Sequence, residues 1–221
     1  MLLRKLMVGV AAAAALGSVQ AQVLLSEGFT NVSALSGAGW VFTNNSVAPD
    51  QPWFQGNTGI FDAAAGVANS YAAASFLSTT AVTGAVSNWL LSPQLTTALP
   101  STVSFSVRVA GSGFLDTLQV RQSTNSGSFD TGATTTSVGD FTTLLTTFSS
   151  STDTGWQNVT ANIPAGFSGR IGFRYLIADV ATAGNYLGMD SLTVTAVPEP
   201  ATYALFALGV AGILFRRRFS A

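Results

Sequence analysis

The sequence predicts an all-β protein, an antiparallel jelly-roll β-sandwich flanked by an N-terminal signal peptide and a single C-terminal transmembrane helix. Two observations predict the sandwich: apolar and polar residues alternate along short segments, and clusters of Gly, Ser, Thr, Asn and Asp separate those segments. An apolar stretch at each end of the chain predicts the flanking parts. We therefore expect a leader at 1–21, a sandwich domain at 22–196 and a tail at 197–221.

The N-terminus has the three parts of a secretory signal peptide. Arg4 and Lys5 are basic, 6–16 is an alanine-rich apolar stretch, and 19–21 reads Val-Gln-Ala. Small residues before the cut are typical of cleavage sites, so we expect cleavage after Ala21. The alternative, a retained N-terminal anchor, needs a longer apolar stretch than this one.

The clearest strand of the body is predicted at Ser101–Ala110, where four apolar residues alternate with polar ones. Such alternation indicates one buried and one solvated face. Shorter strands with the same pattern are expected within 118–121, 159–163, 170–178 and 192–196. No body segment has helical periodicity, and the alanines at 63–65 and 72–74 are expected to form at most a short turn. Roughly ten short strands separated by turns favour a jelly roll.

The body is sparsely charged and acidic. Between residues 22 and 196 it has four arginines, no lysine and nine acidic residues, a net charge of about −5. The basic surface that nucleic acids require is missing, which excludes that class of partner. The chain has no cysteine and no histidine, so a Ser-His-Asp triad and an imidazole or thiolate zinc site are excluded.

The C-terminal tail combines three features. Val197-Pro198-Glu199-Pro200 is followed by an apolar run, Ala201–Phe215, and by Arg216, Arg217 and Arg218. The run is about 22 Å long as a helix, which spans the roughly 30 Å hydrocarbon core only if the arginines extend to the headgroups. The basic end favours the cytoplasmic side, so the body should face outward. A plain C-terminal anchor or a buried last helix are the alternatives, and the absence of a polar face disfavours the buried helix.

This order of parts resembles the PEP-CTERM signal of bacterial exported proteins. The resemblance implies that exosortase, a membrane protease, is a partner and that the chain is held in the inner membrane only during sorting. It further implies delivery to the cell surface or the extracellular space.

Eight short motifs follow one another along the body: Ser26–Phe29, Gly39-Trp40, Trp53–Gly56, Ser70-Tyr71, Asn88–Pro93, Gly155–Gln157, Arg170–Tyr175 and Tyr186–Val194. This succession resembles the choice-of-anchor J family, which is related to cleaved-adhesin domains. They cover nearly the whole body. The resemblance implies a jelly-roll sandwich with a binding or adhesion role and without established catalysis.

Two acidic residues are candidate metal ligands. If the first and last strands pair, Glu27 and Asp190 approach each other and could share a structural calcium ion with backbone carbonyls. The alternative is that each acid caps a turn or pairs with an arginine such as Arg174. No other cofactor is expected.

Among the four tryptophans, Trp53 is the candidate for binding a ligand. It lies between Pro52 and Phe54 in a region that reads as a loop, where an indole ring could stack on a sugar. Trp89, beside Leu90 and Leu91, is expected in the core.

These observations predict a non-enzymatic surface or matrix protein that binds exopolysaccharide or another surface glycan, with no catalytic residues. One alternative is a secreted polysaccharide hydrolase using two carboxylates, such as Asp50 with Asp62 or Asp116 with Asp179. Another is a purely structural protein of the biofilm matrix.

Overall fold

The computed structural model describes residues 21–111, 113–150 and 154–197, of which Val23–Ala196 form one compact unit. The predicted signal peptide and the predicted transmembrane helix lie outside the described residues. Within the described ranges, no helix is long and apolar enough to cross a membrane.

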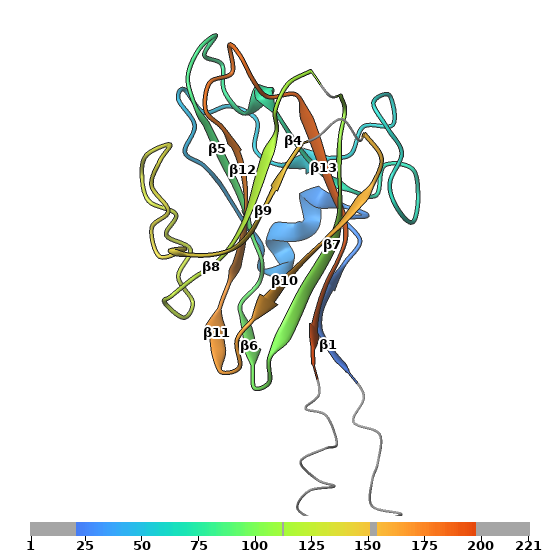
Figure 1. Ribbon diagram of the computed structural model, residues 1–221, viewed down its shortest axis with the longest axis vertical. Coiled ribbons are helices and arrows are strands. Elements are labelled where there is room, and N and C mark those ends of the chain that lie inside the picture. Colours follow the sequence, from blue (N-terminus) through green and yellow to red (C-terminus); the bar gives the residue numbers. More distant parts are fainter. Residues whose placement is uncertain (1–20, 112, 151–153, 198–221) are drawn as a thin grey trace, which may run out of the picture. The chain divides into compact units, whose positions relative to one another are not determined.

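The unit is a jelly-roll sandwich of two antiparallel sheets, as the sequence predicts (Figure 1). The first sheet has the order β10-β7-β13-β4-β3, with β1 also paired to β13; the second has the order β2-β5-β12-β8-β9. The first sheet contains β1 (Gln22–Glu27), β3 (Phe54–Gln55), β4 (Ala72–Ser75), β7 (Ser101–Val109), β10 (Gln157–Ile163) and β13 (Tyr186–Ala196). The second contains β2 (Val41–Asn44), β5 (Val86–Leu91), β8 (Thr117–Gln122), β9 (Thr143–Ser149) and β12 (Ile171–Ile177).

Three small elements complete the unit. A separate two-stranded sheet pairs β6 (Leu95–Thr97) with β11 (Phe167–Gly169). Two 3-10 helices, η1 (Val32–Ala38) and η2 (Phe76–Ser78), lie in the connections. The helix η1 follows β1 and, as Figure 1 shows, is the most prominent helical segment of the fold.

The main core lies between the two sheets and follows the predicted alternation. In β7 the buried residues alternate with partly exposed ones along its whole length. Phe105 of β7 meets Phe173 of β12 edge to face, with ring centroids 5.6 Å apart, so the two sheets are joined by direct aromatic packing. The first and last strands pair, because β1 pairs with β13; this is the condition on which the hypothesis of a site shared by Glu27 and Asp190 depends.

The outer faces of the central strands are also buried, which the simple alternation does not predict. Over the first sheet, Phe61 and Tyr71 pack with Ala73 and Tyr186. Over the second, Phe141 packs on Trp89 and Leu91. We call the two covering segments, residues 56–71 and 123–142, the first and second covering loops. Trp89 is fully buried, as expected.

The alanines at 72–74 form part of strand β4, a strand that no local pattern in the sequence predicts. Ala72 and Ala74 face the main core, and Ala73 lies under the aromatic residues of the first covering loop. The small side chain of Ala73 leaves room for the rings that pack on this strand. Alanine is a weak strand former, and tertiary packing overrides that local preference here.

Tyr71 is held between two glycines. A Cβ atom added at Gly188 of β13 would lie 2.8 Å from a Tyr71 ring atom, and one added at Gly56 would lie 2.3 Å from the same ring. The Tyr71 hydroxyl donates to the carbonyls of Asn57 and Phe61, each at 2.9 Å. Glycine inside a strand often marks such a close approach. The missing side chains therefore create the space in which the covering loop docks.

We expect Gly188→Ala to lower the free energy of unfolding by about 1–3 kcal/mol, because the new methyl group must displace buried rings. Gly37→Ala is the matched control, since a Cβ atom at Gly37 meets nothing within 4 Å; its effect should stay within about 0.5 kcal/mol. Urea unfolding followed by tryptophan fluorescence measures both. Equal stability of the two variants would contradict the docking argument.

Candidate functional site

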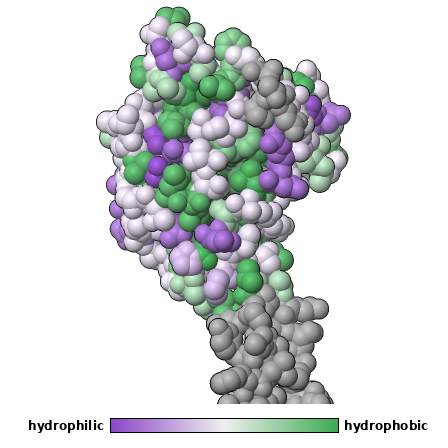
Figure 2. All heavy atoms as spheres, in the orientation of Figure 1, coloured by the Kyte–Doolittle hydropathy of each residue, from purple (hydrophilic) through white to green (hydrophobic). Residues whose placement is uncertain are grey.

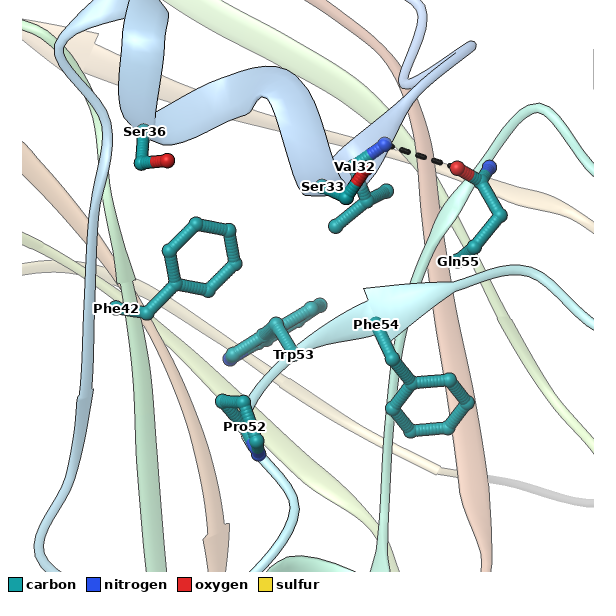
Figure 3. Close-up of a pocket in the computed structure, with 8 residues that line it drawn as sticks. All are labelled: Val32, Ser33, Ser36, Phe42, Pro52, Trp53, Phe54 and Gln55. Carbon is teal, nitrogen blue, oxygen red and sulfur yellow. Dashed lines mark hydrogen bonds between the residues drawn. The ribbon is translucent and has the colours of Figure 1, made fainter.

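A cavity of about 660 Å³ opens between helix η1 and the segment that leads into β3. We call it the η1–β3 cavity. Figure 3 shows the residues that line it: Val32, Ser33, Ser36, Phe42, Pro52, Trp53, Phe54 and Gln55. Its volume lies in the range typical of small-ligand sites.

Trp53, the candidate for binding a ligand, lies in the core and not in an exposed loop. The side chain is 2% exposed and belongs to the main core cluster, and its indole N–H donates to the carbonyl of Asn88 at 3.2 Å. The loop-like local sequence cannot reveal this, because the partner strand is 35 residues away. Trp53 still lines the cavity, so any role in binding is that of an inner wall. Ligand binding by Trp53 stays a prediction.

Phe42 of β2 is an aromatic wall that sequence reasoning missed. Its ring lies on the opposite side of the cavity from Val32 and Gln55, next to Trp53 (Figure 3), and it is only partly buried. Phe54 is turned to the other face of β3, where it meets Tyr186 with centroids 5.8 Å apart. Trp53, just before β3, thus faces the main core, and Phe54 faces the first covering loop.

Gln55 fixes the position of η1 against β3. Its Oε1 accepts from the N–H of Val32 at 2.9 Å, and its Nε2 donates to the carbonyls of Phe29 at 2.9 Å and Asn69 at 2.5 Å. Because Asn31 gives the helix no side-chain cap, the Gln55 carbonyl satisfies an N–H group that the helix start leaves open. The amide holds the cavity walls together.

The rim of the cavity carries hydroxyl groups and the lining has no titratable side chain. Ser33 donates to Asn31 at 2.7 Å, and both Ser33 and Ser36 are exposed. An apolar floor under a hydroxyl rim suits a neutral ligand with one apolar and one polar face. It offers no group for acid–base chemistry.

Asp190, one of the two candidate metal ligands, is buried and accepts backbone hydrogen bonds. Its Oδ2 accepts from the N–H groups of Ala64 at 2.9 Å and Ala65 at 3.0 Å, and its Oδ1 accepts from Ser191 at 2.5 Å. Burial raises the pKa of Asp190, and these three hydrogen bonds oppose that rise. The carboxylate anchors the first covering loop to β13.

Glu27, the other candidate, accepts from the N–H of Phe29 at 2.8 Å. Phe29 has a positive φ of 49°, so this contact stabilises a turn that a bulky residue rarely adopts. Arg174, the arginine considered as a partner for these acids, lies on the second sheet. Within the described part of the chain, no three acidic side chains gather as a metal site would require. Calcium binding by the pair stays a prediction.

The carboxylates of the alternative hydrolase have structural partners. Asp116 is fully buried; its Oδ1 accepts from the Tyr175 hydroxyl at 2.5 Å and from the N–H of Asn185 at 2.9 Å. Burial raises the pKa of Asp116. Asp179 accepts from the N–H groups of Gly84 at 2.8 Å and Ala181 at 3.0 Å, which lower its pKa.

The other carboxylate pair is exposed. Asp50 and Asp62 lie at the surface, and the carbonyl of Asp62 accepts from the indole of Trp156 at 2.9 Å. No contact in the described residues brings either carboxylate pair around a common site.

A family model described as the PEP-CTERM protein-sorting motif matches residues 196–218. The chain carries a PEP-CTERM sorting signal. The match covers the predicted motif Val197–Pro200, the apolar run and the three terminal arginines. The signal implies export, membrane-associated sorting by exosortase and a final place at the cell surface.

The fold is similar to cleaved adhesin domains of Lys-gingipain (Kgp) from Porphyromonas gingivalis. The K3 domain is 15% identical with a TM-score of 0.54, covering 80% of this chain and 100% of that domain. The K1 domain is 16% identical with the same TM-score, covering 81% and 99% respectively. The K2 domain of Lys-gingipain is 18% identical, again with a TM-score of 0.54, covering 79% and 99%. The cleaved-adhesin-like fold expected from the sequence is confirmed, and at this identity the likeness concerns the fold alone.

No curated protein sequence matches the chain.

Asp116 gives the stability a specific pH dependence. The pKa of Asp116 is raised in the folded state, so the folded protein binds more protons than the unfolded chain between the unfolded value, about 3.9, and the folded value. The contribution of Asp116 to the free energy of unfolding therefore falls as the pH rises through that window. We expect Asp116→Asn to become more stable relative to the wild type from pH 4 toward neutral.

Asp179→Asn is the control with the opposite sign. The pKa of Asp179 is lowered, so the wild type gains stability from this group above the unfolded pKa and loses it as the pH falls through the folded one. Urea unfolding across the pH range measures both differences. Parallel curves for the two variants would show that Asp116 is not the buried acid described here.

Proposed function

We propose that the sandwich domain is a surface-displayed glycan-binding module and that the η1–β3 cavity is its sugar site. The observation that carries the proposal is the composition of this cavity: the aromatic walls Trp53 and Phe42 lie beneath a rim of exposed serine hydroxyls. Apolar sugar faces pack on aromatic rings, and sugar hydroxyls need polar partners at the edge. The lining has no titratable group, so the proposed activity is binding without catalysis.

We propose that the mature protein reaches its ligand by two processing steps. Cleavage after Ala21 releases the N-terminus, and the tail holds the chain in the inner membrane until exosortase acts at Pro198-Glu199-Pro200. The protein is then delivered to the surface or to an exopolysaccharide matrix. The matched sorting motif supports this route, and the ligand we propose is polysaccharide of that matrix or another surface glycan.

Replacing Pro198, Glu199 and Pro200 together by alanines should leave full-length, membrane-bound protein. The apolar run and the arginines that we propose insert the tail are unchanged, while the prolines, a residue type that disfavours helical backbone, are gone. Immunoblots of membrane and medium fractions, with intact mass of the mature form, measure the outcome. Processing at the normal rate would contradict the proposed role of the motif.

The sugar site is tested by retention on immobilised polysaccharides and on a glycan array. We expect Phe42→Ala, which removes an aromatic wall, and Ser36→Trp, which fills the mouth, each to weaken retention by about tenfold or more. Val82→Ser is the matched control, because Val82 is 87% exposed and does not line the cavity.

Thermal melting of each variant must first show a folded protein. Equal retention of the wild type and both cavity variants would overturn the assignment of the site. A wild type that binds no glycan would instead favour a purely structural matrix protein, and release of reducing ends would favour the hydrolase.

A further inference from the structure

A second cavity, of about 480 Å³, opens on the outer face of the second sheet beside Arg174. We call it the Arg174 cavity. It is lined by Thr117 of β8, by Thr135 and Thr136 of the second covering loop, and by Ala85, Arg174 and Leu176. The proposed sugar site shares none of these residues, so the two cavities are independent features.

Arg174 is 3% exposed, yet its hydrogen-bond partners among the described residues are all neutral. Its Nε donates to the Ser87 hydroxyl at 3.0 Å, its Nη1 to the Gln119 side-chain carbonyl at 3.4 Å, and its Nη2 to the carbonyl of Thr135. The guanidinium lies over the ring of Trp89, 5.0 Å from its centroid. A guanidinium has further N–H donors beyond these contacts. The cavity adjoins a cation that still has donors to offer.

The surroundings add positive charge and no counter-charge. Burial and the nearby Arg121 lower the pKa of Arg174 to about 10, and no carboxylate opposes that shift. Arg121 donates to Gln119 at 3.0 Å and to the carbonyls of Phe141 and Thr142, which are neutral as well. Asp179 comes directly after residues 176–178, which line the cavity. Its carboxylate accepts from the N–H groups of Gly84 and Ala181 and not from Arg174. Buried charges in proteins are almost always paired, and within the described part of the chain no carboxylate is paired with this cation.

We propose that the Arg174 cavity binds the carboxylate of an acidic monosaccharide unit, such as a uronic acid. The planar fork of arginine matches a carboxylate with two parallel hydrogen bonds. Three threonines can meet the ring hydroxyls, and Ala85 and Leu176 can pack on the apolar face of the ring. The volume is sufficient for one sugar unit. The body carries a net charge of about −5, so its overall charge repels an acidic polysaccharide. Recognition of the acidic sugar must therefore come from contacts inside the cavity.

The test is titration of the mature exported protein with D-glucuronate, D-glucose, acetate and inorganic sulfate. Calorimetry measures affinity, and the NMR signal of the Arg174 Nε–H group reports contact at the site. We expect glucuronate to bind at least about tenfold more tightly than glucose or acetate and to shift that signal. Arg174→Gln should weaken glucuronate binding by about tenfold or more, while Arg108→Gln, which removes an equal charge from the first sheet, where Arg108 lies over Phe61, should change it by less than about threefold.

Ala85→Phe keeps Arg174 and fills the cavity, so it decides the question if Arg174→Gln does not fold. Loss of glucuronate binding in this variant supports the proposal. Equal binding of glucuronate and glucose, binding of sulfate alone, or unchanged binding in both cavity variants overturns it. Ser36→Trp, which fills the other cavity, should leave glucuronate binding intact, so failure of the proposed sugar site and failure of this one give different results.

Discussion

The packing of loop side chains on the outer faces of both sheets is the interaction on which the rest of this structure depends. Phe61 and Tyr71 cover the first sheet, and Phe141 covers the second. With both faces of β5 and β12 buried, the sandwich acquires more apolar contact area than its two sheets alone provide. That gain matters in a chain without disulfides. The walls of the Arg174 cavity arise where the second covering loop crosses the sheet.

The few buried charges of the body hold loops in place through backbone groups. Asp190 accepts from two amides of the first covering loop, Arg174 donates to a carbonyl of the second, and Asp116 accepts from the amide of Asn185 between β12 and β13. A charged group makes stronger hydrogen bonds to the backbone than a neutral one. Burying the carboxylates of Asp190 and Asp116 without partners would cost free energy. Their hydrogen bonds to backbone amides offset that cost and anchor the loops. Arg174 differs because its site is open to a cavity, which leaves room for an external anion.

The sequence predicts the features whose information is local and misses those fixed by distant partners. The alternation of apolar and polar residues predicts the strands at Ser101–Val109 and Ile171–Ile177. The order of proline motif, apolar run and arginines predicts the sorting signal in the tail. Ala72–Ser75 and Trp53 were misjudged, because their neighbours in sequence resemble a loop. Their burial depends on Asn88 and on the first covering loop, which no periodicity reveals. The Arg174 cavity was missed for the same reason: no sequence signal shows that this arginine lacks an acidic partner.

The position of the last strand connects the sorting tail to the stability of the body. Strand β13 lies between β7 and β1 in the first sheet, and its final residues, from Thr193 to Ala196, pair with Ser104 to Ser101. The described chain leaves this sheet at Val197, next to the strand with which the described part begins (Figure 1). A force applied at Val197 would therefore act along β13 and load its hydrogen bonds to β7 together in shear. A central strand with Leu192 and Val194 in the core resists such a load better than an edge strand. The pairing of β1 with β13 thus keeps the last described residues of the body inside the sheet and away from its edge.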